Sequence, residues 1–224
     1  MGGGKVSPYR ERYHRKLDEL RSLTENVAGL VSTSIDQSVT ALRDLNLELA
    51  REVIKNDQIV DDQVQKMENL CMELLALQQP MAKDLRMIIG ILKIGIDLER
   101  IGDLAVDVAR VTAQSQYKTQ VTKLEFIPRM AEIDRNMLGQ AIVALRSDDA
   151  DLARHTTKWD YEIDGLYVKA RDKLLKLIIE KPEIINEGTS LLMANRHLER
   201  IGDHICNICE TIVYMVEAKR EHLN

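Results

Sequence analysis

Two identical six-residue stretches carry the side chains best suited to chemistry in this sequence. Residues 98–103 read Leu-Glu-Arg-Ile-Gly-Asp, and the same six residues return at positions 198–203. The copies lie 100 residues apart in a chain of 224, so each half of the chain holds one. A repeat on this scale indicates two copies of one structural unit. Each copy holds a Glu and an Asp four residues apart, which places both carboxylates on one face of a helix.

Further acidic residues extend each pair into a patch. An Asp pair with the same spacing precedes each copy, and the first copy is followed by a third acid one helical turn later. Like charges at this spacing repel by about 0.2–0.5 kcal/mol per pair, and a bound cation would turn that repulsion into attraction. We therefore predict a metal site in each half. The predicted ligands are Asp57, Asp61, Glu99, Asp103 and Asp107 in the first half, and Asp160, Asp164, Glu199 and Asp203 in the second.

The type of ligand limits the metal. Carboxylates suit cations that prefer oxygen, such as magnesium, calcium, manganese or iron. Zinc is less favoured because few His or Cys residues are near, although His197 and His204 flank the second copy. A ferritin-like di-iron site would need Glu-x-x-His on two helices. That string occurs once, at residues 11–14, and is not repeated, so this type of site is excluded.

Rows of acids on helices are also common as plain solvated surfaces. Arg100 and Arg200 have neighbouring acids with which they can form surface ion pairs of little energetic value. The duplication argues against this interpretation. Both copies keep a glycine, Gly102 or Gly202, that costs a helix interior about 1 kcal/mol relative to Ala. Retention of that cost indicates close approach by another helix or by a ligand.

Composition and periodicity predict an all-α protein. Aromatic residues are only 4% of the chain and prolines number four, whereas Leu, Ile, Ala, Glu, Lys and Arg are abundant. Apolar residues recur with a spacing of three and four along most of the chain. A polar connector covers residues 114–122. The predicted helices cover residues 8–43, 46–77, 81–111 and 128–146, then a fifth from a cap at 147–149 to near 180, and a sixth over 184–218.

The helices divide into two tandem three-helix bundles, residues 1–113 and 121–224. Short connections make neighbouring helices antiparallel within each bundle. On the third helix, Leu98, Ile101 and Ala105 form the core stripe, and the acids lie nearly opposite that stripe. The sequence therefore predicts metal sites at the protein surface rather than inside the bundle.

Composition also excludes several classes of partner and location. The net charge of −5 argues against nucleic acid, because binding to phosphates needs a basic face. The most apolar run, residues 87–96, is too short to cross a bilayer, so no membrane insertion is predicted. Three cysteines are too few for a disulfide framework, and we expect a cytoplasmic protein.

No catalytic residues are predicted, because the sequence has neither a Gly-rich phosphate loop nor a convincing nucleophile–base pair. The protein is therefore expected not to be an enzyme. One alternative is a metal-dependent phosphohydrolase with carboxylate-bridged metals, in which His197 or His204 would supply the acid or base. A second alternative is a helical scaffold without metal.

The two motif copies, the chain length, the two halves and the run Gln79-Pro80 followed by residues 82–86 resemble the PhoU family of phosphate-uptake regulators. The resemblance covers essentially the whole chain. It implies two three-helix bundles and a surface that carries multinuclear metal clusters, of iron or zinc. The carboxylate ligands keep manganese and magnesium as further candidates. The family motif maps onto Glu99 with Asp103 and Glu199 with Asp203. The accompanying acids map onto Asp57, Asp61, Asp160 and Asp164.

The two halves depart from symmetry at two positions near the motif. Asp97 corresponds to His197, and Asp107 corresponds to Asn207. We therefore expect the second site to be less negative than the first and to bind fewer ions.

The resemblance also implies a role. Proteins of this family dampen phosphate uptake and phosphate-starvation signalling by contacting the ATPase subunit of the phosphate ABC transporter and a membrane sensor histidine kinase. A homodimer is expected as well.

Overall fold

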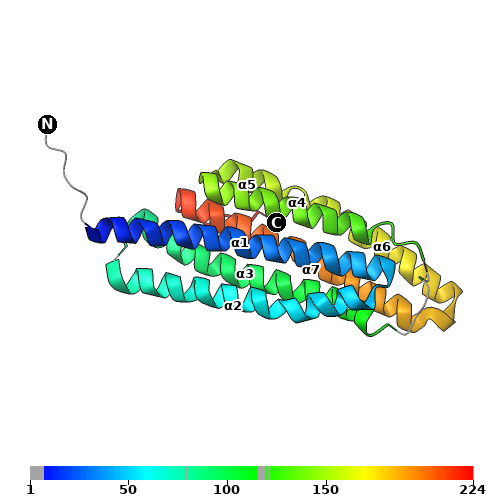
Figure 1. Cartoon of the computed structure of the whole chain (residues 1–224). Coiled ribbons are helices and arrows are strands. Elements are labelled where there is room, and N and C mark those ends of the chain that lie inside the picture. Colours follow the sequence, from blue (N-terminus) through cyan, green and yellow to red (C-terminus); the bar gives the residue numbers. More distant parts are fainter. Residues whose placement is uncertain (1–7, 79, 116–119, 121, 224) are drawn as a thin grey trace.

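The computed structural model describes residues 8–78, 80–115, 120 and 122–223. Within these residues there is no strand, and the helices form one elongated bundle (Figure 1). This confirms the predicted all-α fold. The helices are α1 (Pro8–Asp44), α2 (Leu47–Gln78), α3 (Ala82–Ala113), α4 (Ile127–Ser147), α5 (Ala150–Thr157), α6 (Asp160–Glu180) and α7 (Ile185–Glu217), with a 3-10 turn η1 (Pro182–Ile184) before α7.

Each half forms a helical bundle, and the two bundles meet through α3 and α7. Helices α1, α2 and α3 pack on one another, as do α4, α7 and the α5–α6 pair. The most extensive packing in the molecule is between α3 and α7, and α1 also packs on α4. None of the described helices is long and apolar enough to span a membrane.

Helices α3 and α7 run antiparallel, so the two motif copies lie opposite each other. Arg86, near the start of α3, donates a hydrogen bond to the Met215 carbonyl near the end of α7 (3.3 Å). Next to the motifs, the Nδ1 atom of His204 lies 2.9 Å from a carboxylate oxygen of Asp97. The two motif copies therefore lie in the middle of the α3–α7 contact that joins the two halves.

The core stripe of the motif helices points inward as predicted. Leu98, Ile101 and Ala105 of α3 have no solvent-exposed surface, and the same is true of Leu198 and Ile201 of α7. The acids between them are half-buried at the margin of this stripe.

Most predicted helix boundaries agree with the structure within two residues, but the prediction of a single, continuous fifth helix is wrong. It is broken into α5 and α6 by a turn at Lys158 and Trp159. The Thr156 and Thr157 hydroxyls donate to the carbonyls of Leu152 and Arg154, a side-chain bond that bends helices. Apolar periodicity continues through the turn and so gives no sign of it.

The turn places Asp160 in the first turn of α6, where the helix dipole favours a negative charge. The predicted cap before α5 is confirmed, since the Asp149 carboxylate accepts a hydrogen bond from the Leu152 amide (2.9 Å). The predicted connector 114–122 lies partly outside the described residues, at 116–119 and 121.

Candidate metal-binding surfaces

In each half an aspartate of the neighbouring helix lies beside the motif glycine. A Cβ atom added at Gly102 would lie 3.7 Å from a carboxylate oxygen of Asp57 on α2. A Cβ atom added at Gly202 would lie only 2.5 Å from a carboxylate oxygen of Asp160 on α6. The close approach that the retained glycines predicted is therefore present at Gly202, whereas the contact at Gly102 is an ordinary one.

In the first half, the five predicted acids gather into one patch. Burial, and then the negative charges of Asp61, Asp103 and Asp107, raise the pKa of Asp57 to about 6 against the opposing charge of Arg110. The pKa of Asp61 is raised by burial and by Asp103. The patch therefore combines partial desolvation with like charge.

The pKa of Glu99 is also raised, mainly by burial and additionally by Asp103 and Asp61, while Arg100 opposes the shift. Arg100 donates to Asp103 (2.9 Å) and Arg110 donates to Asp107 (2.6 Å). The sequence suggested the Arg100 pair as a surface ion pair but not the Arg110 pair, and both leave the clustering of the acids in place.

In the second half, the predicted acids lie at two depths. Glu199, Asp203 and Asp164 form the outer group, in which burial and mutual charge raise the pKa values of Glu199 and Asp203. Arg196 forms an ion pair with Glu199 and opposes both shifts. Asp160 lies deeper, with 2% of its surface exposed.

Sequence reasoning missed one acid, Asp134 on α4. The side chains around Gly102 are Asp57, Val60 and Val31, and those around Gly202 are Asp160, Ile163 and Asp134. All three second-half positions follow their first-half counterparts by 103 residues, so Asp134 stands where the first half has Val31. The offset alone could not have marked Asp134 as a site residue, because its first-half counterpart is apolar.

Asp134 is fully buried, and neither of its carboxylate oxygens has a hydrogen-bond partner among the described residues. Burial and the neighbouring Asp160 raise its pKa well above the ordinary value. With Asp134 counted, each half brings five acids to its motif helix, which offsets the replacement of Asp107 by Asn207. The expectation that the second site is less negative than the first was made without counting Asp134.

The asymmetric positions near the motifs face each other across the α3–α7 contact. Asp97 lies beside His204 and also accepts a hydrogen bond from the Asn207 amide (3.4 Å). Burial lowers the pKa of His197, and the charge of Asp107 opposes this shift. Asp97 and Asp107 of α3 thus each face a neutral or basic residue of α7, so His197 and Asn207 prevent two acids from opposing each other at these positions.

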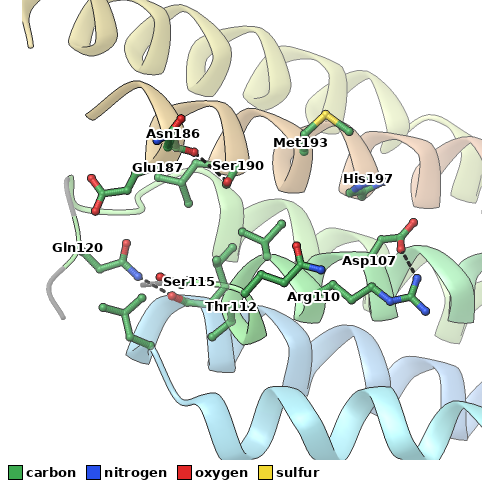
Figure 2. A pocket seen from close by; sticks show the side chains of 15 residues that line it. Asp107, Arg110, Thr112, Ser115, Gln120, Asn186, Glu187, Ser190, Met193 and His197 are labelled. Atoms are coloured by element: carbon green, nitrogen blue, oxygen red, sulfur yellow. Dashed lines mark hydrogen bonds and ion pairs between the residues drawn. The ribbon is translucent and has the colours of Figure 1, made fainter. Parts of the chain in front are cut away.

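A cavity of about 620 Å³ lies where the end of α3 meets the start of α7 (Figure 2). Figure 2 shows Asp107 and its partner Arg110 on one wall and Met193 and His197 on the other. Because Asp107 also belongs to the first-half patch, the cavity adjoins that patch.

The donor chemistry of both patches suits cations that prefer oxygen, because the ligands offered are carboxylates. Among the described residues, no three His, Cys, Asp or Glu side chains are arranged to hold an ion as they stand. The buried, unpartnered oxygens of Asp134 and Glu199 are groups that a cation would satisfy. The patches therefore fit a metal by charge and atom type, although their ligands are not already drawn together.

Comparisons with known proteins identify the family. A model of the PhoU domain matches residues 24–112 and 127–212. The chain belongs to the PhoU family. Each matched segment contains one motif copy and falls within one predicted half, while the boundaries 1–113 and 121–224 remain predictions.

Relatives and solved structures agree with this membership. The chain is 36% identical over 207 residues to a Pseudomonas putida protein named phosphate-specific transport system accessory protein PhoU homolog, covering 92% of this chain and 81% of that protein. A Clostridium acetobutylicum protein with the same name is 32% identical, covering 96% and 99%.

The crystal structure of PhoU from Pseudomonas aeruginosa superposes with a TM-score of 0.88 at 34% identity, covering 92% of this chain and 100% of that one. The phosphate transport system regulatory protein PhoU from Streptococcus pneumoniae gives a TM-score of 0.87 at 29% identity, covering 93% and 99%. These matches confirm the predicted fold and the predicted family.

The two motif glycines should respond oppositely to Ala. At Gly102 the new methyl group would meet only ordinary contacts, so Gly102→Ala should stabilise metal-free protein by about 1 kcal/mol through helix propensity. At Gly202 it would collide with buried Asp160 and Ile163, so Gly202→Ala should destabilise by about 1–3 kcal/mol. Urea unfolding in chelator measures both values. Equal shifts of the same sign would contradict the described difference between the halves.

Removing the Asp57 charge should stabilise metal-free protein at neutral pH. Folding raises the pKa of Asp57 from 3.8 to about 6, so the folded state holds the Asp57 proton more tightly than the unfolded state. The stabilisation that this proton gives at low pH is therefore lost as pH rises through that interval. Asp57→Asn should therefore match wild type near pH 4 and become the more stable protein as pH rises to about 6 and above. Unfolding curves in chelator across this range test the effect. Asp62→Asn, an exposed neighbour on α2, is the matched control.

Proposed function

We propose that this chain is a metal-binding regulator of phosphate uptake. The observation that carries the metal part is the repeated gathering of acids around a glycine, with pKa values raised by burial and like charge in both halves. The regulatory part is supported by relatives named as accessory proteins of phosphate-specific transport. The metal part and the regulatory part are both consistent with a protein that acts by binding other proteins rather than by catalysing a reaction.

The bound group would be a cluster of metal ions, iron first, with zinc, manganese or magnesium as alternatives. The ions would supply positive charge and would neutralise carboxylates that otherwise repel one another. The residues proposed to hold them are Asp57, Asp61, Glu99, Asp103 and Asp107 in one patch, and Asp160, Asp164, Glu199 and Asp203 in the other.

The proposed partners are the ATPase subunit of the phosphate ABC transporter and a membrane sensor histidine kinase, both reached from the cytoplasm. Contact with them would dampen phosphate uptake and phosphate-starvation signalling. The chain is proposed to act as a homodimer. Loading of the patches would change a partner-facing surface from strongly negative to nearly neutral, and electrostatic complementarity governs partner choice and association rate.

The metal proposal predicts that the motif glutamates control metal content. Protein purified without a chelating tag should contain metal by elemental analysis, and Glu99→Ala combined with Glu199→Ala should remove most of it, because each patch loses a central carboxylate. Glu132→Ala, which removes an exposed acid of α4, is the control and should leave metal content unchanged. Unaltered metal content in the double variant would refute the assignment.

The regulatory proposal predicts direct binding to the transporter ATPase subunit, the sensor kinase, or both. Biolayer interferometry with each purified partner from the same organism should show saturable binding by wild type. The Glu99→Ala and Glu199→Ala double variant should bind differently, because its surface charge and metal load are altered. Absence of wild-type binding to both partners would contradict the proposal.

A further inference from the structure

The buried Asp134 carboxyl group has no role in the packing of the core. It stands on α4 among buried residues spaced for a core-facing stripe, Met130, Ala131, Met137 and Leu138. In the first half the same position is filled by Val31, which is equally buried. An apolar residue therefore serves this position of the fold, whereas an unpartnered carboxyl group is costly there.

Asp134 and Asp160 approach the same point on α7. One oxygen of each lies near the position where a Gly202 Cβ atom would stand, at 3.5 Å for Asp134 and 2.5 Å for Asp160. Asp160 can come this close because residue 202 has no side chain. The other side chain near that position is Ile163, and Cys206 lies one turn further along α7, where burial and the nearby Asp160 raise the pKa of its thiol.

Another buried carboxylate oxygen without a partner among the described residues belongs to the outer acids of the second half. Glu199 precedes Gly202 by three residues on α7, which places both on the same side of that helix. The Oε2 atom of Glu199 is buried and has no hydrogen-bond partner among the described residues. All the buried, unpartnered carboxylate oxygens of the described chain belong to Asp134 and Glu199, and both residues lie in the second half.

We propose that Asp134 is a metal ligand, and that Asp134 and Asp160 hold a divalent cation over Gly202 at a position with no equivalent in the first half. The inference rests on the proposed function, because Asp160 is one of the ligands proposed there. Two carboxylates and one divalent cation are together neutral, which removes the cost of burying the acids. The cation would be one that prefers oxygen, because both proposed ligands are carboxylates.

Burial gives this ion a property that the surface ions lack. The first-half acids are exposed or half-buried, so solvent and chelators reach their ions directly. Asp134 is fully buried and Asp160 nearly so, so an ion between them is shielded from solvent. Its release to a chelator is therefore expected to be slower than that of ions held in the first half.

The test uses full-length protein and Mn²⁺ as the probe. Binding is followed by equilibrium dialysis with electron paramagnetic resonance of free Mn²⁺. Asp134→Val restores the first-half residue, and Asp134→Asn keeps the shape while removing the charge. Asp151→Asn, at a carboxylate 95% exposed, is the control for loss of one negative charge.

Wild type should bind Mn²⁺ in both halves, with a slowly released fraction. Asp134→Val and Asp134→Asn should lose that fraction or weaken it by at least about tenfold, while Asp151→Asn should not. Thermal unfolding adds a second readout. In chelator, Asp134→Val should melt above wild type because a buried unpaired carboxyl group is gone, but the increase in Tm on adding Mn²⁺ should be smaller.

Two results would overturn the proposal, and they differ. If wild type binds Mn²⁺ and both Asp134 variants bind it identically, Asp134 is a buried neutral acid and not a ligand, while the proposed metal surfaces stand. If wild type binds no Mn²⁺, iron or zinc at all, the proposed function fails together with this inference. Should Asp134→Val fold poorly, the same comparison is made with Asp134→Asn.

Discussion

The absence of a side chain at Gly202 is the constraint on which the second acidic surface depends. A Cβ atom at Gly202 would collide with Asp160 of the neighbouring helix, whereas at Gly102 it would meet Asp57 only at ordinary distance. In both halves the neighbouring helix brings its aspartate against the motif helix, where the acids lose part of their water and repel one another. The fold thus accepts a local cost, twice, to concentrate carboxylates at the edge of a well-packed core.

The contact between α3 and α7 converts two such units into one molecule. The motif copies lie opposite each other in antiparallel helices, and this geometry brings the flanking residues of one copy against those of the other. Asp97 meets His204 and Asn207, and the charge of Asp107 acts on His197. Perfect duplication would have placed acids against acids here. Loss of symmetry at these positions is what allows the two copies to pack together.

The sequence predicted the helices, the duplication and the direction of the acid rows, because each follows from short-range periodicity and a repeat. It did not predict the turn at Lys158 and Trp159, since the apolar pattern runs through that turn without a break and the threonine hydroxyl bonds beside it also occur within unbroken helices. It also missed Asp134, because membership of the second patch depends on α4 packing against α6 and α7, a tertiary fact. For the same reason, Asn207 first appeared to be a weakened ligand rather than a neighbour of Asp97.

The central claim is that the acids around each motif glycine bind metal. Anomalous diffraction from crystals of protein loaded with iron or Mn²⁺ tests it most directly, because it places each ion among named side chains. The account predicts anomalous peaks beside both glycines, one bounded by Asp57 and Glu99 and the other by Asp160 and Glu199. Crystals of metal-loaded protein that show no peak at either position, or peaks only elsewhere on the surface, would contradict it.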